Sequence, residues 1–178
     1  MRKTNVKTDR KQLQPKRRVG GGQSGKEKAS AVSTVKPLHI HNTVLYRIVD
    51  KPENDMTSLE KMDVAKAGIS KLDLEDLKEK TKLDYTKLAK VISVTRATLI
   101  NKKGASKFSM SISESILGVA DIYSYGYEVF EDIDRFNEWI SRPNRALGYK
   151  APYEIMDSQF GREEVKNLIG RIEYGVYS

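Results

Sequence analysis

Apolar residues recur at helical spacing along most of the chain beyond its first third. Thr57 followed by Glu60 has the spacing of a capping box, in which two side chains satisfy otherwise free backbone amides, and Gly68 ends the helix that follows. Asp73 and Asp84 precede two further apolar stripes and are predicted to cap helices there. The pattern predicts four helices in this region, over residues 57–68, 74–80, 85–91 and 95–102.

The second half of the chain contains its longest amphipathic pattern, which begins at Ser113 and continues to about Phe130. Ser111 and Glu114 have capping-box spacing at its start. Pro143 cannot continue a helix, because proline lacks the amide hydrogen and clashes with the preceding turn. We expect a long helix and three shorter ones, over residues 113–130, 134–141, 151–160 and 162–172.

The remaining segments have no helical pattern. Residues 43–49 are rich in β-branched side chains and are predicted to form a short strand. Residues 1–36 have too few large apolar side chains to offset the entropy of ordering, so we expect a disordered basic tail. Because strands and helices do not alternate, the predicted fold is mainly α. The expected divisions are the tail (1–36), an N-terminal segment with the strand and one helix (37–71), and two helical domains (72–112 and 113–178).

The distribution of charge indicates two kinds of partner. Residues 1–36 carry eleven basic and two acidic side chains, and residues 85–113 carry six basic side chains and no acidic one. Residues 114–178 carry seven basic and twelve acidic side chains. Cationic segments favour phosphate-rich partners, because binding releases counterions. The acidic C-terminal third favours a different partner.

Residues 85–102 have the layout of a helix-turn-helix. Ala89 is small enough for two helices to cross closely, and Val94 and Leu99 are expected to fill their junction. The second helix would expose the residue types that reach base edges and phosphates. We therefore interpret residues 72–112 as a domain that binds operator double-stranded DNA; an ordinary helical packing unit with a solvated basic face is the alternative. The candidate DNA-binding residues are Thr95, Arg96, Thr98, Asn101, Lys102, Lys103 and Lys107, with Lys87 and Lys90 beside them.

Catalysis, metal binding and membrane insertion find little support. The chain has two histidines, no cysteine and no carboxylates paired in an apolar setting, so we expect no enzymatic activity, cofactor or metal site. Residues 20–26 imitate a phosphate-binding loop, but Glu27 stands where Ser or Thr would bind magnesium, and a flexible linker is the better interpretation. No apolar run approaches the ~20 residues that cross a bilayer. These features favour a cytoplasmic protein.

The last forty residues contain the most specific motifs of the chain. They follow three patterns, W-x-x-x-P-N-x-x-L-G, G-x-x-x-V and R-I-x-x-G-V-Y. The matching residues are Trp139, Pro143, Asn144, Leu147, Gly148, Gly161, Val165, Arg171, Ile172, Gly175, Val176 and Tyr177. Together with the helix-turn-helix, over residues 72–178, this arrangement resembles antitoxins of the Xre/MbcA/ParS type, which carry a C-terminal toxin-binding domain.

The resemblance implies an antitoxin of a type II toxin–antitoxin system. In that family the C-terminal region covers the active site of a RES-domain toxin, which consumes NAD or transfers ADP-ribose from it, and many members repress their own operon. Residues 113–178 would then dimerise and bind the toxin. A stand-alone transcriptional regulator is the alternative function.

The candidate toxin-binding residues lie in a loop and at the end of the chain. An aromatic terminus behind a helix suggests a segment that docks, because chain ends are usually polar, and Tyr and Arg are enriched at interface hot spots. A terminus folded back on its own helices is the alternative. The candidates are Arg142, Arg145, Lys150, Arg171, Tyr174, Val176, Tyr177 and Ser178.

Tyr149 departs from the pattern of the family, which usually has a second glycine after Leu147-Gly148. A glycine is required where the backbone φ angle is positive. If this position has a positive φ, Tyr149 is strained. We expect structural roles for four motif residues. Trp139 and Leu147 would fill the core, Pro143 would end a helix, and Asn144 would cap a turn.

Overall fold

The computed structural model describes residues 41–176, which belong to one compact unit. Residues 1–40 and 177–178 lie outside the described part of the chain. The predictions that fall there are the disordered basic tail, the phosphate-loop imitation and the two terminal candidates Tyr177 and Ser178.

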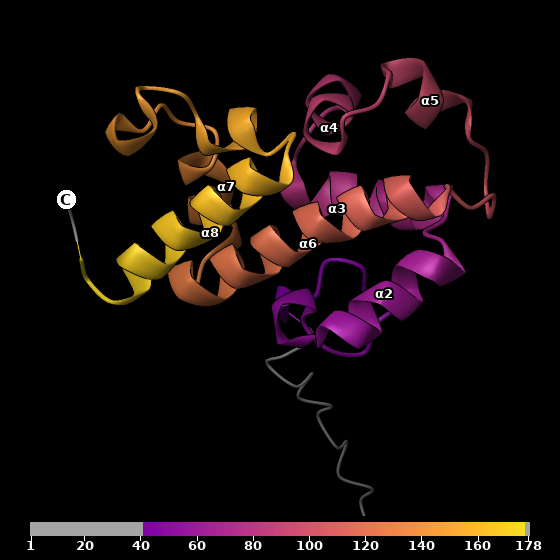
Figure 1. Cartoon of the computed structure of the whole chain (residues 1–178), viewed down its shortest axis with the longest axis horizontal. Helices are drawn as coiled ribbons and strands as arrows, with labels where there is room; N and C mark the ends of the chain where they lie inside the picture. The colour runs from indigo at the N-terminus through magenta and orange to yellow at the C-terminus, as the bar shows by residue number, and fades with distance from the viewer. Residues whose placement is uncertain (1–40, 177–178) are drawn as a thin grey trace, which may run out of the picture. The chain divides into compact units, whose positions relative to one another are not determined.

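The described part is mainly helical, as the sequence predicts, and residues 41–176 form no strand. The long helix α6 (Met110–Phe130) packs against the helices around it, with α2 on one side and α8 on another (Figure 1). The other helices are α2 (Ser58–Ala67), α3 (Lys71–Thr81), α4 (Tyr85–Ile92), α5 (Arg96–Asn101), α7 (Ile133–Trp139) and α8 (Gln159–Glu173). Short 3-10 turns are η1 (Glu53–Asp55), η2 (Arg145–Leu147) and η3 (Pro152–Ile155).

Helix starts follow the local capping signals in most places. Thr57 and Glu60 form the predicted capping box of α2. Asp84 caps α4 through the amides of its first turn. At α3 the prediction was wrong by one turn, because Ser70 is the N-cap and Asp73 is the third helical residue that completes its capping box. Local side-chain hydrogen bonds therefore set these boundaries.

Two other predicted boundaries were also wrong. The helix α6 starts at Met110, before the predicted Ser111–Glu114 capping box, and its N-cap Ser109 makes no side-chain capping bond. Gly161 does not break a helix but is the third residue of α8, where its amide donates to Ser158 Oγ at 3.1 Å. A Cβ at this glycine would lie 1.6 Å from the Ile155 carbonyl oxygen, so the turn before α8 requires glycine there.

The predicted strand over residues 43–49 was wrong, because these residues form turns and bends. The buried carboxylate of Glu53 accepts the amides of Val44, at 2.9 Å, and Leu45, at 2.5 Å. A strand would satisfy these amides with a neighbouring strand, whereas here one long-range side chain does so. Burial raises the pKa of Glu53, although these amide bonds act in the opposite direction.

The core around the C-terminal end of α6 is aromatic. The rings of Tyr123 and Tyr127 pack edge-on against Phe136 of α7, and Phe136 stacks on Trp139. This packing depends on Gly126, because a Cβ there would lie 2.1 Å from the Phe136 ring. Trp139 therefore has the structural role expected for it.

The end of α3 is tied to both later and earlier parts of the chain. The carbonyl of Lys80 accepts hydrogen bonds from Tyr127 Oη and from Asn137 Nδ2, each at 3.0 Å. Its ammonium donates to the carbonyls of His41 and Thr43, at 2.6 and 2.5 Å. One residue thus joins the segment before η1 to α3, α6 and α7.

A second tie joins α2, α6 and α8. Asp121 on α6 forms ion pairs with Lys61 on α2, at 2.7 Å, and with Lys166 on α8, at 2.8 Å. Because the carboxylate is largely buried, these pairs are less screened by solvent than surface pairs are. They fix α8 relative to the N-terminal helices.

Candidate functional site

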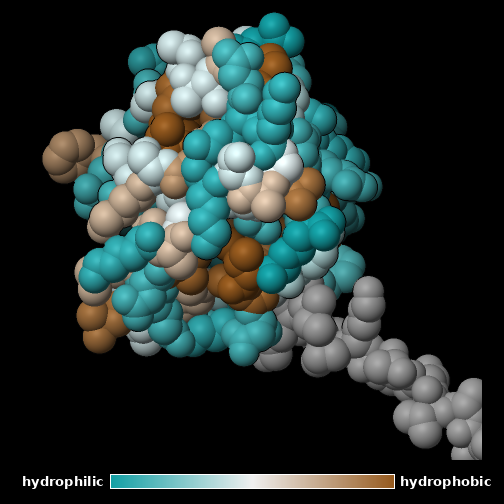
Figure 2. Space-filling model, turned by 90° about the vertical axis from the view of Figure 1, so that its right-hand side faces the viewer, coloured by the Kyte–Doolittle hydropathy of each residue, from teal (hydrophilic) through white to brown (hydrophobic). Residues whose placement is uncertain are grey.

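The helix-turn-helix segment exposes a polar face. Leu99 is fully buried and is the one buried residue of α5. Thr95 is the N-cap of α5, and its hydroxyl accepts the Thr98 amide at 3.1 Å. Arg96 and Asn101 are exposed, as are Thr95 and Thr98. The geometry is therefore compatible with the predicted recognition helix. Figure 2 views the α5 side of the molecule, whose surface is mostly hydrophilic.

The three candidate lysines after α5 differ in their surroundings. Lys103 is exposed. Lys102 is half-buried, with its ammonium 5.5 Å from the centroid of the Phe108 ring. Lys107 donates to the Ala67 carbonyl at the end of α2, at 2.7 Å. The side chain of Lys103 is thus exposed, while those of Lys102 and Lys107 have contacts within the chain.

Lys87 and Lys90 of α4 meet the segment that precedes α8. Their ammonium groups lie 5.2 and 5.7 Å from the centroid of the Tyr153 ring. Lys90 Nζ also lies 3.6 Å from a carboxylate oxygen of Glu154. Ser93, at the turn after α4, donates to the Asp157 carbonyl at 2.5 Å. The sequence offered no signal for this junction between α4 and η3.

The loop between α7 and η3 carries three of the candidate toxin-binding residues. Arg142 forms an ion pair with Glu138, one turn earlier on α7. Arg145 and Lys150 are exposed. Asn144 caps η2 by accepting the Ala146 amide at 2.9 Å, as expected for a structural residue. In Figure 1 this orange loop lies toward the left of the view, as the end of α8 does.

The residues that follow α8 are exposed as far as Val176. Tyr174 is 79% exposed and Val176 is 56% exposed. The Val176 amide donates to the Arg171 carbonyl at 2.8 Å, and Gly175 has a positive φ of 67°, which is a common helix ending. Arg171 is exposed on the last turn. This end therefore presents apolar surface to solvent.

The two most exposed aromatic residues outside the predicted site are Phe160 and Tyr149. Phe160 is 83% exposed at the start of α8, and Tyr149 is 72% exposed in the loop after α7. Tyr149 has a φ of 65°, so the sequence-based expectation of strain at this position is confirmed. Phe160 had no sequence signal, because the pattern placed it at the end of a helix that Gly161 would break.

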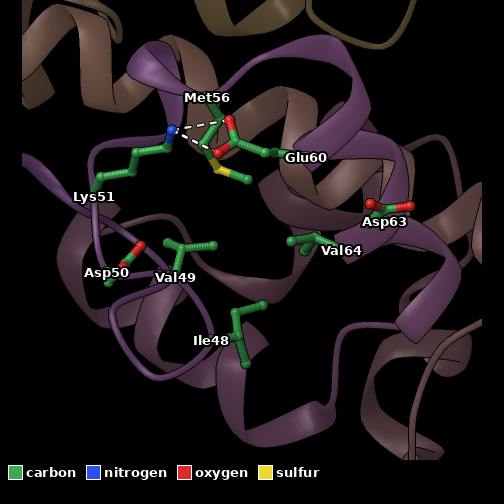
Figure 3. Close-up of a pocket in the computed structure, with 8 residues that line it drawn as sticks. All are labelled: Ile48, Val49, Asp50, Lys51, Met56, Glu60, Asp63 and Val64. Carbon is green, nitrogen blue, oxygen red and sulfur yellow. Dashed lines mark hydrogen bonds and ion pairs between the residues drawn. The ribbon is translucent and has the colours of Figure 1, made fainter.

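A pocket of about 260 Å³ lies away from the candidate residues, between α2 and the turns before it (Figure 3). At the edge of the pocket, Lys51 Nζ lies 2.7 Å from Glu60 Oε1. The bonds from Lys51 and the Thr57 amide lower the pKa of the exposed Glu60 to about 2. The pocket is lined by Ile48, Val49, Asp50, Lys51, Met56, Glu60, Asp63 and Val64.

Residues 41–176 contain neither a metal site nor a membrane-spanning helix. No group of three or more acidic or histidine side chains is arranged to hold a metal ion in this range. None of the helices described is both long and apolar enough to span a membrane.

Comparison with known proteins relates the C-terminal part of the chain to antitoxins. Residues 126–175 match the model of the antitoxin Xre/MbcA/ParS C-terminal toxin-binding domain. This segment contains the end of α6, α7, the loop with Tyr149, and α8 with the exposed Tyr174.

Three characterised relatives are antitoxins. An Antitoxin Xre of Photorhabdus laumondii is 37% identical over 76 residues, which are 42% of this chain and 51% of the relative. An Antitoxin Xre of Yersinia enterocolitica is 32% identical over 73 residues, 40% of this chain and 49% of the relative. The match to the Prs ADP-ribosylating antitoxin of a Sphingobium species is 24% identical over 131 residues, 67% of this chain and 82% of the relative.

The chain spans about half the length of the two Xre antitoxins that it matches. Of the residues that carry the motif patterns, those from Trp139 to Gly175 lie within the segment that the family model matches. Residues 126–175 are therefore similar to the C-terminal toxin-binding domain of Xre/MbcA/ParS antitoxins.

Proposed function

We propose that the protein is the antitoxin of a type II toxin–antitoxin system and that it blocks a RES-domain, NAD-consuming toxin by steric occlusion. It would use no chemistry of its own. In this proposal it also binds operator DNA and represses its operon, as a homodimer in the cytoplasm.

The exposed end of α8 is the observation that carries the toxin-binding proposal. Tyr174 and Val176 are exposed to solvent. Burying them against a partner would be favourable, because it removes apolar surface from water. Arg171 adds a cation on the same helical turn as Tyr174. Aromatic and Arg side chains are the types that dominate interface energetics. A segment of this kind fits a protein cleft better than it fits DNA.

The class of toxin is inferred from relatives. The name of the Sphingobium relative joins the words antitoxin and ADP-ribosylating. ADP-ribosylation consumes NAD, so a toxin that acts on NAD is consistent with that name. A RES-domain toxin is the member of this class that the family resemblance implies.

The proposal for DNA rests on α4 and α5. Arg96 and Asn101 are exposed on a short helix that follows a tight turn, and residues 85–113 have no acidic side chain. Arg recognises guanine and Asn recognises adenine through paired hydrogen bonds. A homodimer would place two such helices on an inverted repeat.

Co-expression with the product of the neighbouring gene tests the proposed function. Cellular NAD and growth are measured with the full chain and with a chain that lacks residues 174–178. We expect the full chain to restore both, and the truncated chain to fail while it still binds operator DNA. A matched control is Arg135→Ala, which removes an exposed cation from α7 and should rescue like the full chain.

Two results would contradict the proposal. If the neighbouring product causes no loss of NAD, the assignment to a NAD-consuming toxin fails, and a stand-alone regulator becomes the better explanation. If the truncated chain rescues as well as the full chain, the end of α8 is not the inhibitory element.

A further inference from the structure

Tyr149 is the residue whose backbone the fold explains least. Among residues 41–176, four residues other than glycine have a positive φ: Lys82, Ser93, Glu131 and Tyr149. The first three each end a helix, where the left-handed conformation is a normal cap. The fourth does not, because Gly148 already caps η2. Tyr149 therefore holds an unfavourable conformation that no helix ending requires.

The loop around Tyr149 is closed by its own hydrogen bonds. The Tyr149 amide donates to the Asn144 carbonyl at 2.9 Å, and the Asn144 amide donates to the Lys150 carbonyl at 2.9 Å. The Ala146 amide is held by the Asn144 side chain. These bonds fix the backbone on both sides of Tyr149. An aromatic side chain presented from a fixed backbone loses little freedom on binding.

The side chain of Tyr149 is directed to solvent. It is 72% exposed, and a Cβ at the neighbouring Gly148 would meet nothing within 4 Å. The conformation is therefore not maintained by packing of this ring within the chain. Strained residues of this kind occur at functional sites, where the surrounding structure maintains them.

The charges beside Tyr149 indicate the kind of partner. Arg145 and Lys150 are exposed on the same loop, and residues 139–153 contain no acidic side chain. Two carboxylates lie close to the loop, Glu138 paired with Arg142 and Glu154 after it. The pKa of Glu154 is lowered chiefly by the Ala151 amide, and also by Lys90 and Lys150. The loop also lies within residues 126–175, which match a toxin-binding domain, so a protein partner is favoured over DNA.

We propose that the loop of residues 142–150 is a second, preformed contact for the toxin, with Tyr149 as its aromatic anchor and with Arg145 and Lys150 facing carboxylates on the toxin. This inference rests on the proposed antitoxin function. The contact is separate from the end of α8 in sequence.

The substitution Tyr149→Gly tests the proposal, because stability and binding should change in opposite directions. Glycine removes the strain, so we expect the melting temperature to stay level or rise by about 2 °C. Loss of the anchor should weaken toxin binding about tenfold or more. The affinity of the full chain for the product of the neighbouring gene is measured by calorimetry, and unfolding by circular dichroism. Tyr149→Phe should retain most of the affinity.

The matched control is Glu131→Gly, which removes another exposed side chain from a residue of positive φ in the same domain. It should alter the melting temperature in the same direction and leave toxin binding unchanged. The truncated chain that lacks residues 174–178 is measured alongside, so that the two contacts are distinguished.

Four outcomes would overturn the inference. If Tyr149→Gly binds the toxin with unchanged affinity, Tyr149 is not a toxin contact. If the truncated chain binds more weakly in the same experiment, the proposed function still stands. A lower melting temperature together with weaker binding assigns Tyr149 to the fold. Weaker binding of a random-sequence DNA duplex, with toxin binding intact, assigns the loop to DNA. Failure of the unaltered chain to bind the toxin removes this inference and the proposed function together.

Discussion

The helix α5 and the end of α8 are both exposed helical segments, but they expose different side chains. The face of α5 carries hydroxyl, amide and guanidinium groups, and one buried residue, Leu99, attaches it to the core. The end of α8 exposes Tyr174 and Val176. The preceding turns are attached to the core by the buried side chains of Val165 and Ile169. A polar, cationic surface suits a hydrated and charged partner, whereas exposed apolar side chains suit a partner that excludes water. The difference favours DNA for the first and protein for the second.

Leu99→Ala should produce the largest effect and tests whether α5 depends on one anchor. Removing a fully buried leucine side chain costs about 2–5 kcal/mol of unfolding free energy. We expect DNA affinity to fall with it, because α5 is no longer held in place. Urea unfolding and DNA titration measure the two quantities. Ile100→Ala, at an exposed neighbour, should change stability by less than about 0.5 kcal/mol. Equal losses in the two variants would show that α5 has no single anchor.

Tyr174→Ala tests the apolar surface of α8. Truncation of an interface hot spot costs about 2 kcal/mol or more, so toxin affinity should fall about thirtyfold. Stability should change little, because the side chain is exposed in the free protein. The binding constants for toxin and for operator DNA are measured on the same preparation. A parallel loss of DNA affinity would remove the distinction between the two surfaces.

Arg96→Ala tests the polar surface of α5. Loss of one paired contact to a base costs about 1–3 kcal/mol of DNA affinity and relaxes sequence preference at one position. Neutralisation of the toxin should be unaffected. An electrophoretic shift assay beside growth rescue separates the two, with Arg135→Ala as the control for loss of a cation. Loss of rescue together with DNA binding would contradict the division of labour.

Glu154→Gln should have the smallest effect and tests the junction between α4 and η3. The pKa of Glu154 is lowered in the folded state, so its contribution to stability is present above the ordinary value of 4.5 and is lost as the pH falls through the folded value. The stability difference between the variant and the unaltered chain should therefore close in acid. At neutral pH the variant frees Lys90, and DNA affinity should rise about twofold. A fall in DNA affinity would mean that Glu154 positions Lys90 for DNA.

Sequence patterns predicted the features that depend on neighbours in the chain. Thr57 and Asp84 cap helices as expected, because the amides that they bind are within three residues. For Tyr149 the motif gave a conditional expectation, strain if its φ is positive, and its φ is 65°. Features that depend on distant residues were missed. The amides of Val44 and Leu45 are satisfied by Glu53 and not by a strand, and no local pattern reports such a bond.

The candidate site shows the same limit. The exposure of Arg96 and Asn101 follows from the period of a short helix, and the structure agrees. Lys87 and Lys90 contact Tyr153, which lies more than sixty positions later in the chain. The sequence pattern that placed these two lysines beside DNA does not report this contact. Burial and tertiary contacts decide which of several exposed cations remains free for a partner.

The bonds to the Lys80 carbonyl have a consequence for how this protein loses its structure. Tyr127 and Asn137, which belong to the C-terminal elements, complete the end of α3 in the N-terminal half. A fragment that ended before α6 would leave that carbonyl without them, and the aromatic core would be absent. We therefore expect the described part to melt in one cooperative transition. Under the proposed function, a single unfolding event would release the toxin and free the operator at the same moment.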